Sequence, residues 1–196
     1  MSLLYFPSQA SSSSDGGSLT YISKNTSSAA TSSAFTSDID STYTSYIFQI
    51  QGIHFNTDAV QFQFQFSTDG GTSYGVEAVS FMYYGGRAAT GSHTFFGNIT
   101  GTYGLASATT YQTLGWSIAS DADVSASGWV QLHQPSSTTY MKMVDYQFTY
   151  HNSANELVST YGSMYLNTTS AIDAVNFQPS SGNMDGVISM YGVKNS

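Results

Sequence analysis

Gln61-Phe-Gln-Phe-Gln-Phe66 alternates polar and apolar residues with a period of two and leads into the turn Ser67-Thr-Asp-Gly-Gly71. Successive side chains of a β-strand point to opposite faces, so the three phenylalanines would share one face and the glutamines the other. A helix would scatter the same rings around its circumference. The stretch therefore predicts a half-buried β-strand and an all-β chain.

Similar alternations recur between turn residues along the chain and predict twelve strands. They cover approximately residues 19–23, 32–36, 45–53, 59–66, 76–84, 92–99, 111–118, 127–133, 140–151, 156–166, 171–177 and 186–194. No ten-residue window has helical periodicity. The apolar stripes of Tyr46–Ile50 and Val144–Tyr150 are expected to face each other from opposing sheets about 10 Å apart. We therefore expect one antiparallel, jelly-roll-like β-sandwich over residues 18–196, with its strand order open.

Composition limits the classes of function. Charged residues make up 8% of the 196 residues, and the net charge is −8. The four cations form no run that could neutralise successive phosphates, so we expect no nucleic-acid binding. The 12 Phe, 15 Tyr and 2 Trp supply enough apolar area for a folded core. The chain has no cysteine, and the sequence shows neither a signal peptide nor a membrane span, which favours folding in a reducing cytoplasm.

Residues 1–17 differ from the rest of the chain. An apolar tip formed by Leu3, Leu4, Tyr5 and Phe6 precedes a linker rich in serine and glycine. The segment is interpreted either as a frayed terminus or as an arm whose tip docks on a neighbouring subunit. Small-residue segments at 85–91 and 99–110 are expected to be loops, either solvated connections or binding tips.

Motifs for catalysis or metal binding are weak. The histidines His54, His93, His133 and His151 lie far apart in sequence, without the spacing of a metal motif. No G-x-S-x-G element places a serine for nucleophilic attack. The two glutamates, Glu77 and Glu156, form a conceivable glycosidase pair, although structural roles are favoured. The acidic pairs Asp38/Asp40 and Asp121/Asp123 are interpreted as turn residues in preference to calcium ligands. We therefore predict no catalytic residue, no metal and no cofactor.

Aromatic side chains offer a different kind of site. An aromatic ring can stack on the apolar face of a sugar while neighbouring amides and carboxylates bind its hydroxyl groups. Tyr83, Tyr84, Trp116 and Trp129 are the candidates for glycan binding. Large aromatic residues of a sandwich more often belong to its core, and this alternative remains open.

Several ordered segments carry a resemblance to a known group of proteins. They are Asp40–Ile50, Asn56–Val60, Phe64–Tyr74, Ala171–Phe177, Ser181–Asn183 and Gly186–Val193. Together they resemble small β-sandwich structural proteins of tailed bacteriophages, which include tail fibres, virion appendages and capsid decoration proteins. Residues 85–135 depart from that pattern.

The resemblance implies a virion location after synthesis in the host cytoplasm and supplies no catalytic residues. It also implies contacts with other capsid or tail proteins and assembly as a homo-oligomer, of which a trimer is the form typical of the group. We expect a non-enzymatic structural component that decorates the capsid or forms part of a neck or tail appendage. The alternatives are a receptor-binding module that recognises host surface glycan and, as a third class, a depolymerase.

Overall fold

The structure, a computed structural model, describes residues 19–91, 94–99 and 103–194. The arm at 1–17, with Leu3, Leu4, Tyr5 and Phe6, lies outside these residues. The strands are β1 (Leu19–Ala30), β2 (Ser33–Phe35), β3 (Ser45–Phe55), β4 (Val60–Ser67), β5 (Ala78–Ala88), β6 (Thr94–Ile99), β7 (Gln112–Ile118), β8 (Ala126–His133), β9 (Lys142–His151), β10 (Glu156–Leu166), β11 (Ala174–Pro179) and β12 (Met184–Val193). Each of the twelve predicted strands overlaps one of these. The largest difference is at β1, which continues to Ala30.

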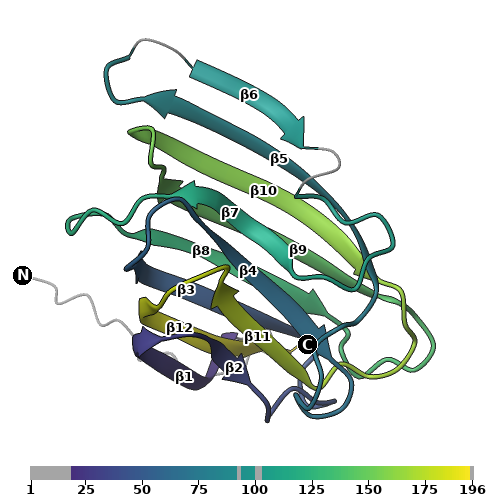
Figure 1. Cartoon of the computed structure of the whole chain (residues 1–196). Coiled ribbons are helices and arrows are strands. Elements are labelled where there is room, and N and C mark those ends of the chain that lie inside the picture. Colours follow the sequence, from purple (N-terminus) through teal and green to yellow (C-terminus); the bar gives the residue numbers. More distant parts are fainter. Residues whose placement is uncertain (1–18, 92–93, 100–102, 195–196) are drawn as a thin grey trace, which may run out of the picture.

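The strands form two antiparallel sheets of unequal size that pack face to face (Figure 1). The long sheet has eight strands in the order β1-β12-β3-β8-β9-β10-β5-β6, and the short sheet has four in the order β2-β11-β4-β7. The described residues contain no helix. The predicted all-β sandwich is therefore confirmed.

The stretch that indicated the fold lies at the centre of the core. Phe62, Phe64 and Phe66 on β4 are fully buried. The Phe62 ring centroid lies 5.4 Å from that of Phe148 in the long sheet, and that of Phe64 lies 5.6 Å from that of Tyr146. The phenylalanine face of β4 thus joins the two sheets, as its alternation predicts.

The two apolar stripes do not face each other, contrary to our expectation. Tyr46–Ile50 belongs to β3 and Val144–Tyr150 to β9, and both strands lie in the long sheet with only β8 between them. Both stripes point inward to the short sheet. The alternation of a strand indicates which residues share a face, whereas its sheet depends on long-range pairing.

The expected loop at 85–91 is also wrong in part, because β5 continues through Gly85 and Gly86 to Ala88. A Cβ at Gly86 would overlap the ring of Phe95 on the paired strand β6. Glycine at this position leaves room for the ring against the sheet. The strand therefore continues through Gly85 and Gly86, a sequence that is otherwise typical of a turn.

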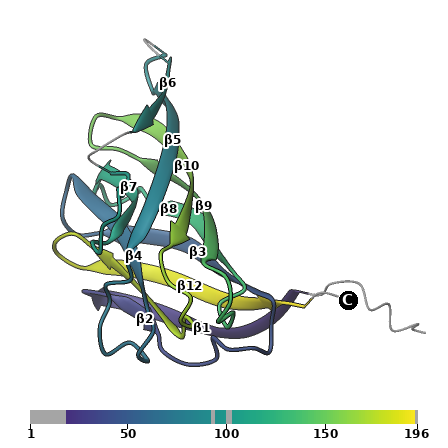
Figure 2. The ribbon, with the colours of Figure 1, turned by 90° about the vertical axis from the view of Figure 1, so that its right-hand side faces the viewer.

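The long sheet extends past the short one. The edge strand β7 lies over β9 and β10, where Thr160 Oγ1 donates a hydrogen bond to the Leu114 carbonyl at 2.6 Å. β5 and β6 continue beyond β7 (Figure 2). Residues of the segment before β7 cover one end of β5, since Leu105 exchanges backbone and side-chain hydrogen bonds with Ser80. Among the described residues, no comparable segment covers the other end of β5.

Candidate functional site

The outer face of the long sheet, which points away from the short sheet, exposes an unusual amount of apolar surface. Of the ten exposed large apolar side chains among the described residues, eight lie on this face. Six of them gather on β5, β6, β9 and β10 and are named here the outer patch: Phe81, Tyr83, Phe96, Met143, Leu157 and Tyr161. Phe96 is the most open, at 76% exposure.

The rings of the outer patch contact one another. The centroids of Phe81 and Tyr83 lie 4.4 Å apart with nearly perpendicular planes, and those of Tyr83 and Phe96 lie 5.7 Å apart and stack. Register places Tyr161 of β10 directly beside Tyr83. Since β-strands present alternate residues on one face, these contacts make a continuous surface across three strands.

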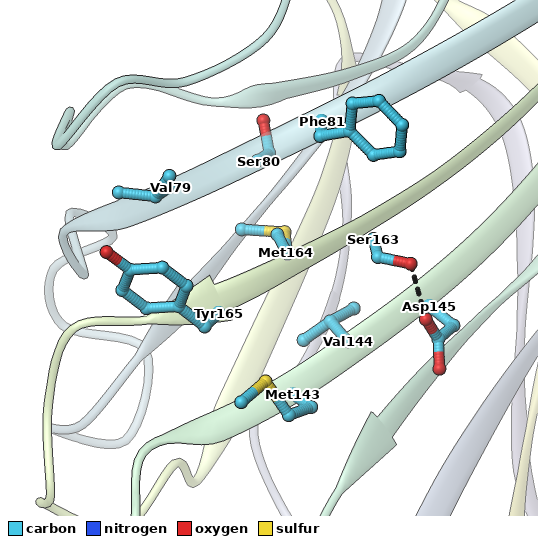
Figure 3. Close-up of a pocket in the computed structure, with 9 residues that line it drawn as sticks. All are labelled: Val79, Ser80, Phe81, Met143, Val144, Asp145, Ser163, Met164 and Tyr165. Atoms are coloured by element: carbon cyan, nitrogen blue, oxygen red, sulfur yellow. Dashed lines mark hydrogen bonds between the residues drawn. The ribbon is translucent and has the colours of Figure 1, made fainter.

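A hollow of about 440 Å³ opens beside the patch, where the small side chain of Ser163 lies on β10 (Figure 3). Phe81 of β5, Met143 of β9 and Tyr165 of β10 surround it. Its lining is mostly apolar, with a polar pair in which Ser163 Oγ donates a hydrogen bond to Asp145 Oδ1 at 2.7 Å. His133 Nε2 lies 3.1 Å from the second oxygen of Asp145.

This serine, aspartate and histidine do not form a hydrolase triad. In such a triad the histidine accepts the proton of the serine, and the aspartate orients the histidine. Here Asp145 lies in the middle and takes the hydrogen bond of Ser163 itself. The serine hydroxyl is therefore bonded to the carboxylate and not to the histidine, which is not the order of a triad.

A second concave site lies on the inner face of the same sheet, at the overhang beyond β7. Its volume is about 340 Å³, and it is lined by Tyr84, Phe95, Trp116, Asn152, Glu156 and Val158. The centroids of Tyr84 and Trp116 lie 5.0 Å apart with an edge-to-face angle of 79°, and those of Tyr84 and Phe95 lie 5.6 Å apart. We name this site the aromatic cleft.

Contacts behind the cleft hold its largest ring in place. Tyr103 stacks on Trp116 with centroids 5.0 Å apart and an interplanar angle of 18°. The Trp116 backbone N–H donates to the Tyr150 hydroxyl at 3.2 Å. Burial raises the pKa of Tyr150, so its hydroxyl stays protonated at neutral pH.

The polar wall of the cleft comes from the turn between β9 and β10. Asn152 Nδ2 donates to Glu156 Oε2 at 2.7 Å, and Asn152 Oδ1 accepts the backbone N–H groups of Ala154 and Glu156. The amide and the carboxylate are thus held by the turn itself. They place an amide and a carboxylate beside three aromatic rings.

The structure separates the four aromatic residues predicted for glycan binding into two pairs. Tyr84 and Trp116 come together in the aromatic cleft. Tyr83 lies on the outer face, and so does Trp129, whose Nε1 donates to Gln147 Oε1 at 3.2 Å. Tyr83 and Tyr84 are neighbours on one strand and therefore point to opposite faces.

Several residues of both sites were not predicted from the sequence. They are Phe81, Phe96, Met143, Leu157 and Tyr161 of the outer patch and Phe95, Tyr103, Asn152, Glu156 and Val158 in or behind the cleft. Phe81 and Tyr83 alternate with other residues on β5, and Leu157 and Tyr161 share one face of β10. This pattern could have indicated an apolar outer face. Nothing local in the sequence indicates that Tyr103 stacks on Trp116.

The glutamates do not form a glycosidase pair. β5 and β10 are antiparallel, with Ala88 opposite Glu156 and Ala78 opposite Leu166, so Glu77 and Glu156 lie at opposite ends of the paired strands. At about 3.3 Å per residue, their separation along the strands is about 35 Å. The two carboxyl groups of a glycosidase lie about 5–9.5 Å apart.

Among the remaining acidic candidates, Asp40 has structural partners. Asp40 Oδ1 accepts the Thr42 backbone N–H at 2.7 Å and the Tyr46 hydroxyl at 3.0 Å. These hydrogen bonds, from Thr42 above all, lower the pKa of Asp40. Within the part of the chain that the structure describes, no three His, Asp or Glu side chains gather as metal ligands. His93 lies outside that part.

Comparison with known proteins assigns no family to this chain. No family model and no curated protein matches the chain. A crystal structure from Bacteroides ovatus, determined by structural genomics and of unknown function, is similar with 9% identity and a TM-score of 0.29. The match covers 56% of this chain and 45% of that one, so the chain spans less than half the length of that protein. No helix among the described residues is long and apolar enough to cross a membrane.

Proposed function

We propose that the chain is a non-enzymatic structural component of a tailed-phage virion, made in the host cytoplasm and assembled through contacts between subunits. It would decorate the capsid or form part of a neck or tail appendage. The phage part of the proposal rests on the sequence resemblance. The observation that supports assembly is the outer patch, because a contiguous exposed apolar surface on a folded domain marks an interaction site.

The composition of the outer face suits burial against another protein. Aromatic residues and methionine are enriched in the centres of protein interfaces, and charged residues are depleted there. Phe81, Tyr83, Phe96, Tyr161 and Met143 supply the first group. Because the chain is poor in charged residues, few charges would lose their water when the face is covered.

The experiment introduces one charge at the centre of the patch, in Tyr161→Lys. The matched control is Gln63→Lys on β4, which adds the same charge to the polar outer face of the short sheet. Sedimentation velocity of the purified chain measures self-association, and immunogold labelling of virus particles measures incorporation. We expect Tyr161→Lys to reduce self-association and labelling, with Gln63→Lys close to the unmodified chain.

Two results would overturn the proposal. Particles without label, probed with antibodies to several epitopes, would remove the virion assignment. Incorporation of Tyr161→Lys at the unmodified level would show that the outer patch is not the assembly surface. A parallel deletion of residues 1–17 tests whether the arm, with Leu3 to Phe6, contributes to docking.

A further inference from the structure

We infer that the aromatic cleft binds a neutral sugar residue. This function is separate from assembly and does not rest on the virion proposal. The cleft lies on the inner face of the overhang, whereas the outer patch lies on the opposite face of the same strands. Each site can therefore be tested without the other.

The walls of the cleft match the apolar face of a pyranose. Tyr84 and Phe95 present partly exposed rings from adjacent strands, and Trp116 closes the third side from β7. Glycines opposite these rings, on the paired strand, leave the room that the rings occupy. A Cβ on Gly97 would lie 3.0 Å from the Tyr84 ring, and one on Gly86 would overlap Phe95.

The polar groups match the hydroxyl edge of the same ligand. A sugar ring has C–H groups on its faces and hydroxyls at its rim, so its site needs aromatic surface and hydrogen-bonding oxygens side by side. Asn152 and Glu156 supply an amide and a carboxylate fixed by the turn between β9 and β10. Polar groups that are already oriented cost less entropy when a ligand binds.

Charge and size narrow the ligand class. The Glu156 carboxylate lies in the wall, and the whole chain carries a net charge of −8, so an acidic sugar would be repelled. The volume of about 340 Å³ is near the lower end of the range of about 300–1,000 Å³ for small-molecule sites. It fits one or two sugar rings of a longer surface glycan.

The chain offers a direct reporter for this site. Of its two tryptophans, Trp116 on β7 of the short sheet lies in the cleft, and Trp129 lies on the outer face of the long sheet. The variant Trp129→Phe leaves Trp116 as the single source of tryptophan fluorescence. Any change on titration with a sugar then reports on the cleft.

The experiment titrates Trp129→Phe with methyl glycosides of glucose, galactose, mannose, N-acetylglucosamine and rhamnose, and with glucuronic and sialic acids. We expect saturable binding of at least one neutral sugar and none of the acidic ones. Adding Tyr84→Ala should weaken binding by about tenfold, since it removes one aromatic face. The control Tyr140→Ala removes the same side chain from an exposed position before β9, outside both the cleft and the outer patch, and should leave binding unchanged.

Folding of each variant is checked by its urea transition. The variant Glu156→Gln, which keeps the size of the side chain, is a second test of binding. We expect this change to weaken binding of the neutral sugar and to reduce discrimination against glucuronic acid. The inference is overturned if the folded chain binds no neutral sugar in the panel. It is also overturned if Tyr84→Ala and Glu156→Gln both bind as tightly as the parent, or if only acidic sugars bind.

Discussion

Thr160 on β10 connects the two sheets below the aromatic cleft, and its replacement by valine tests how the cleft is positioned. The side chain is fully buried. Its Oγ1 lies 2.6 Å from the Leu114 carbonyl of β7, to which it donates, and 3.2 Å from the Phe148 carbonyl. Valine has nearly the same shape and cannot donate, so Thr160→Val removes the hydrogen bond without opening a cavity.

The loss of stability in Thr160→Val comes from the Leu114 carbonyl, which no longer receives a hydrogen bond. A buried polar group left without a partner costs about 1–3 kcal/mol, and we expect Thr160→Val to lower the free energy of unfolding by this amount. With an m-value of about 2 kcal/mol per molar urea, the midpoint should fall by about 0.5–1.5 M. Thr160→Ser keeps the hydroxyl and loses one methyl group, for which about 0.5–1.5 kcal/mol is expected.

Urea denaturation monitored by circular dichroism measures both variants. In the Trp129→Phe background, emission from Trp116 at low urea reports in addition whether β7 has shifted. Since Leu114 and Trp116 lie two residues apart on β7, we expect a shift in this emission for Thr160→Val and none for Thr160→Ser. A stability of Thr160→Val within about 0.5 kcal/mol of the parent would refute the role of this hydrogen bond.

Two further predictions concern the packing of the long sheet and a turn. Gly128→Ala would place a methyl group against the Gln147 backbone carbonyl on the neighbouring strand, so we expect a loss of about 1–3 kcal/mol in urea denaturation; unchanged stability would mean that β8 and β9 can move apart. Hydrogen bonds from the Ser73 and Ser67 side chains lower the pKa of Asp69 from 3.8 to about 2. The resulting stabilisation is present above about pH 4 and is lost as the pH falls to about 2. Over that range Asp69→Asn should lose less stability than the parent, and parallel pH profiles would contradict the assignment.

The strands could be predicted from the sequence because their signal is local. The Phe62 to Phe66 alternation and the glycine turns between apolar runs reflect the alternation of side chains along each strand and the backbone of each turn. Which sheet a strand joins is not local. The stripes on β3 and β9 have equivalent patterns, and only the pairing of β8 with both shows that they lie in one sheet.

The candidate sites were predictable in part. Tyr84 and Trp116 could be named as aromatic candidates, but they come from strands in different sheets, and their contact depends on how far the long sheet extends past β7. Asn152 and Glu156 enter the cleft only through the turn between β9 and β10. The aromatic cleft is assembled from β5, β6, β7, the turn after β9, and β10. No single motif in the sequence therefore indicates it.

The division of aromatic residues along β5 connects the two proposals. Phe81 and Tyr83 belong to the outer patch, and Tyr84 belongs to the cleft, because neighbours on a strand point to opposite faces. A partner that covers the outer patch would therefore leave the cleft open. If both proposals hold, an assembled particle displays its sugar-binding clefts on the side away from the subunit contacts. Tyr161→Lys should then reduce assembly while the isolated chain binds sugar as before, and Tyr84→Ala should weaken sugar binding while assembly is unchanged.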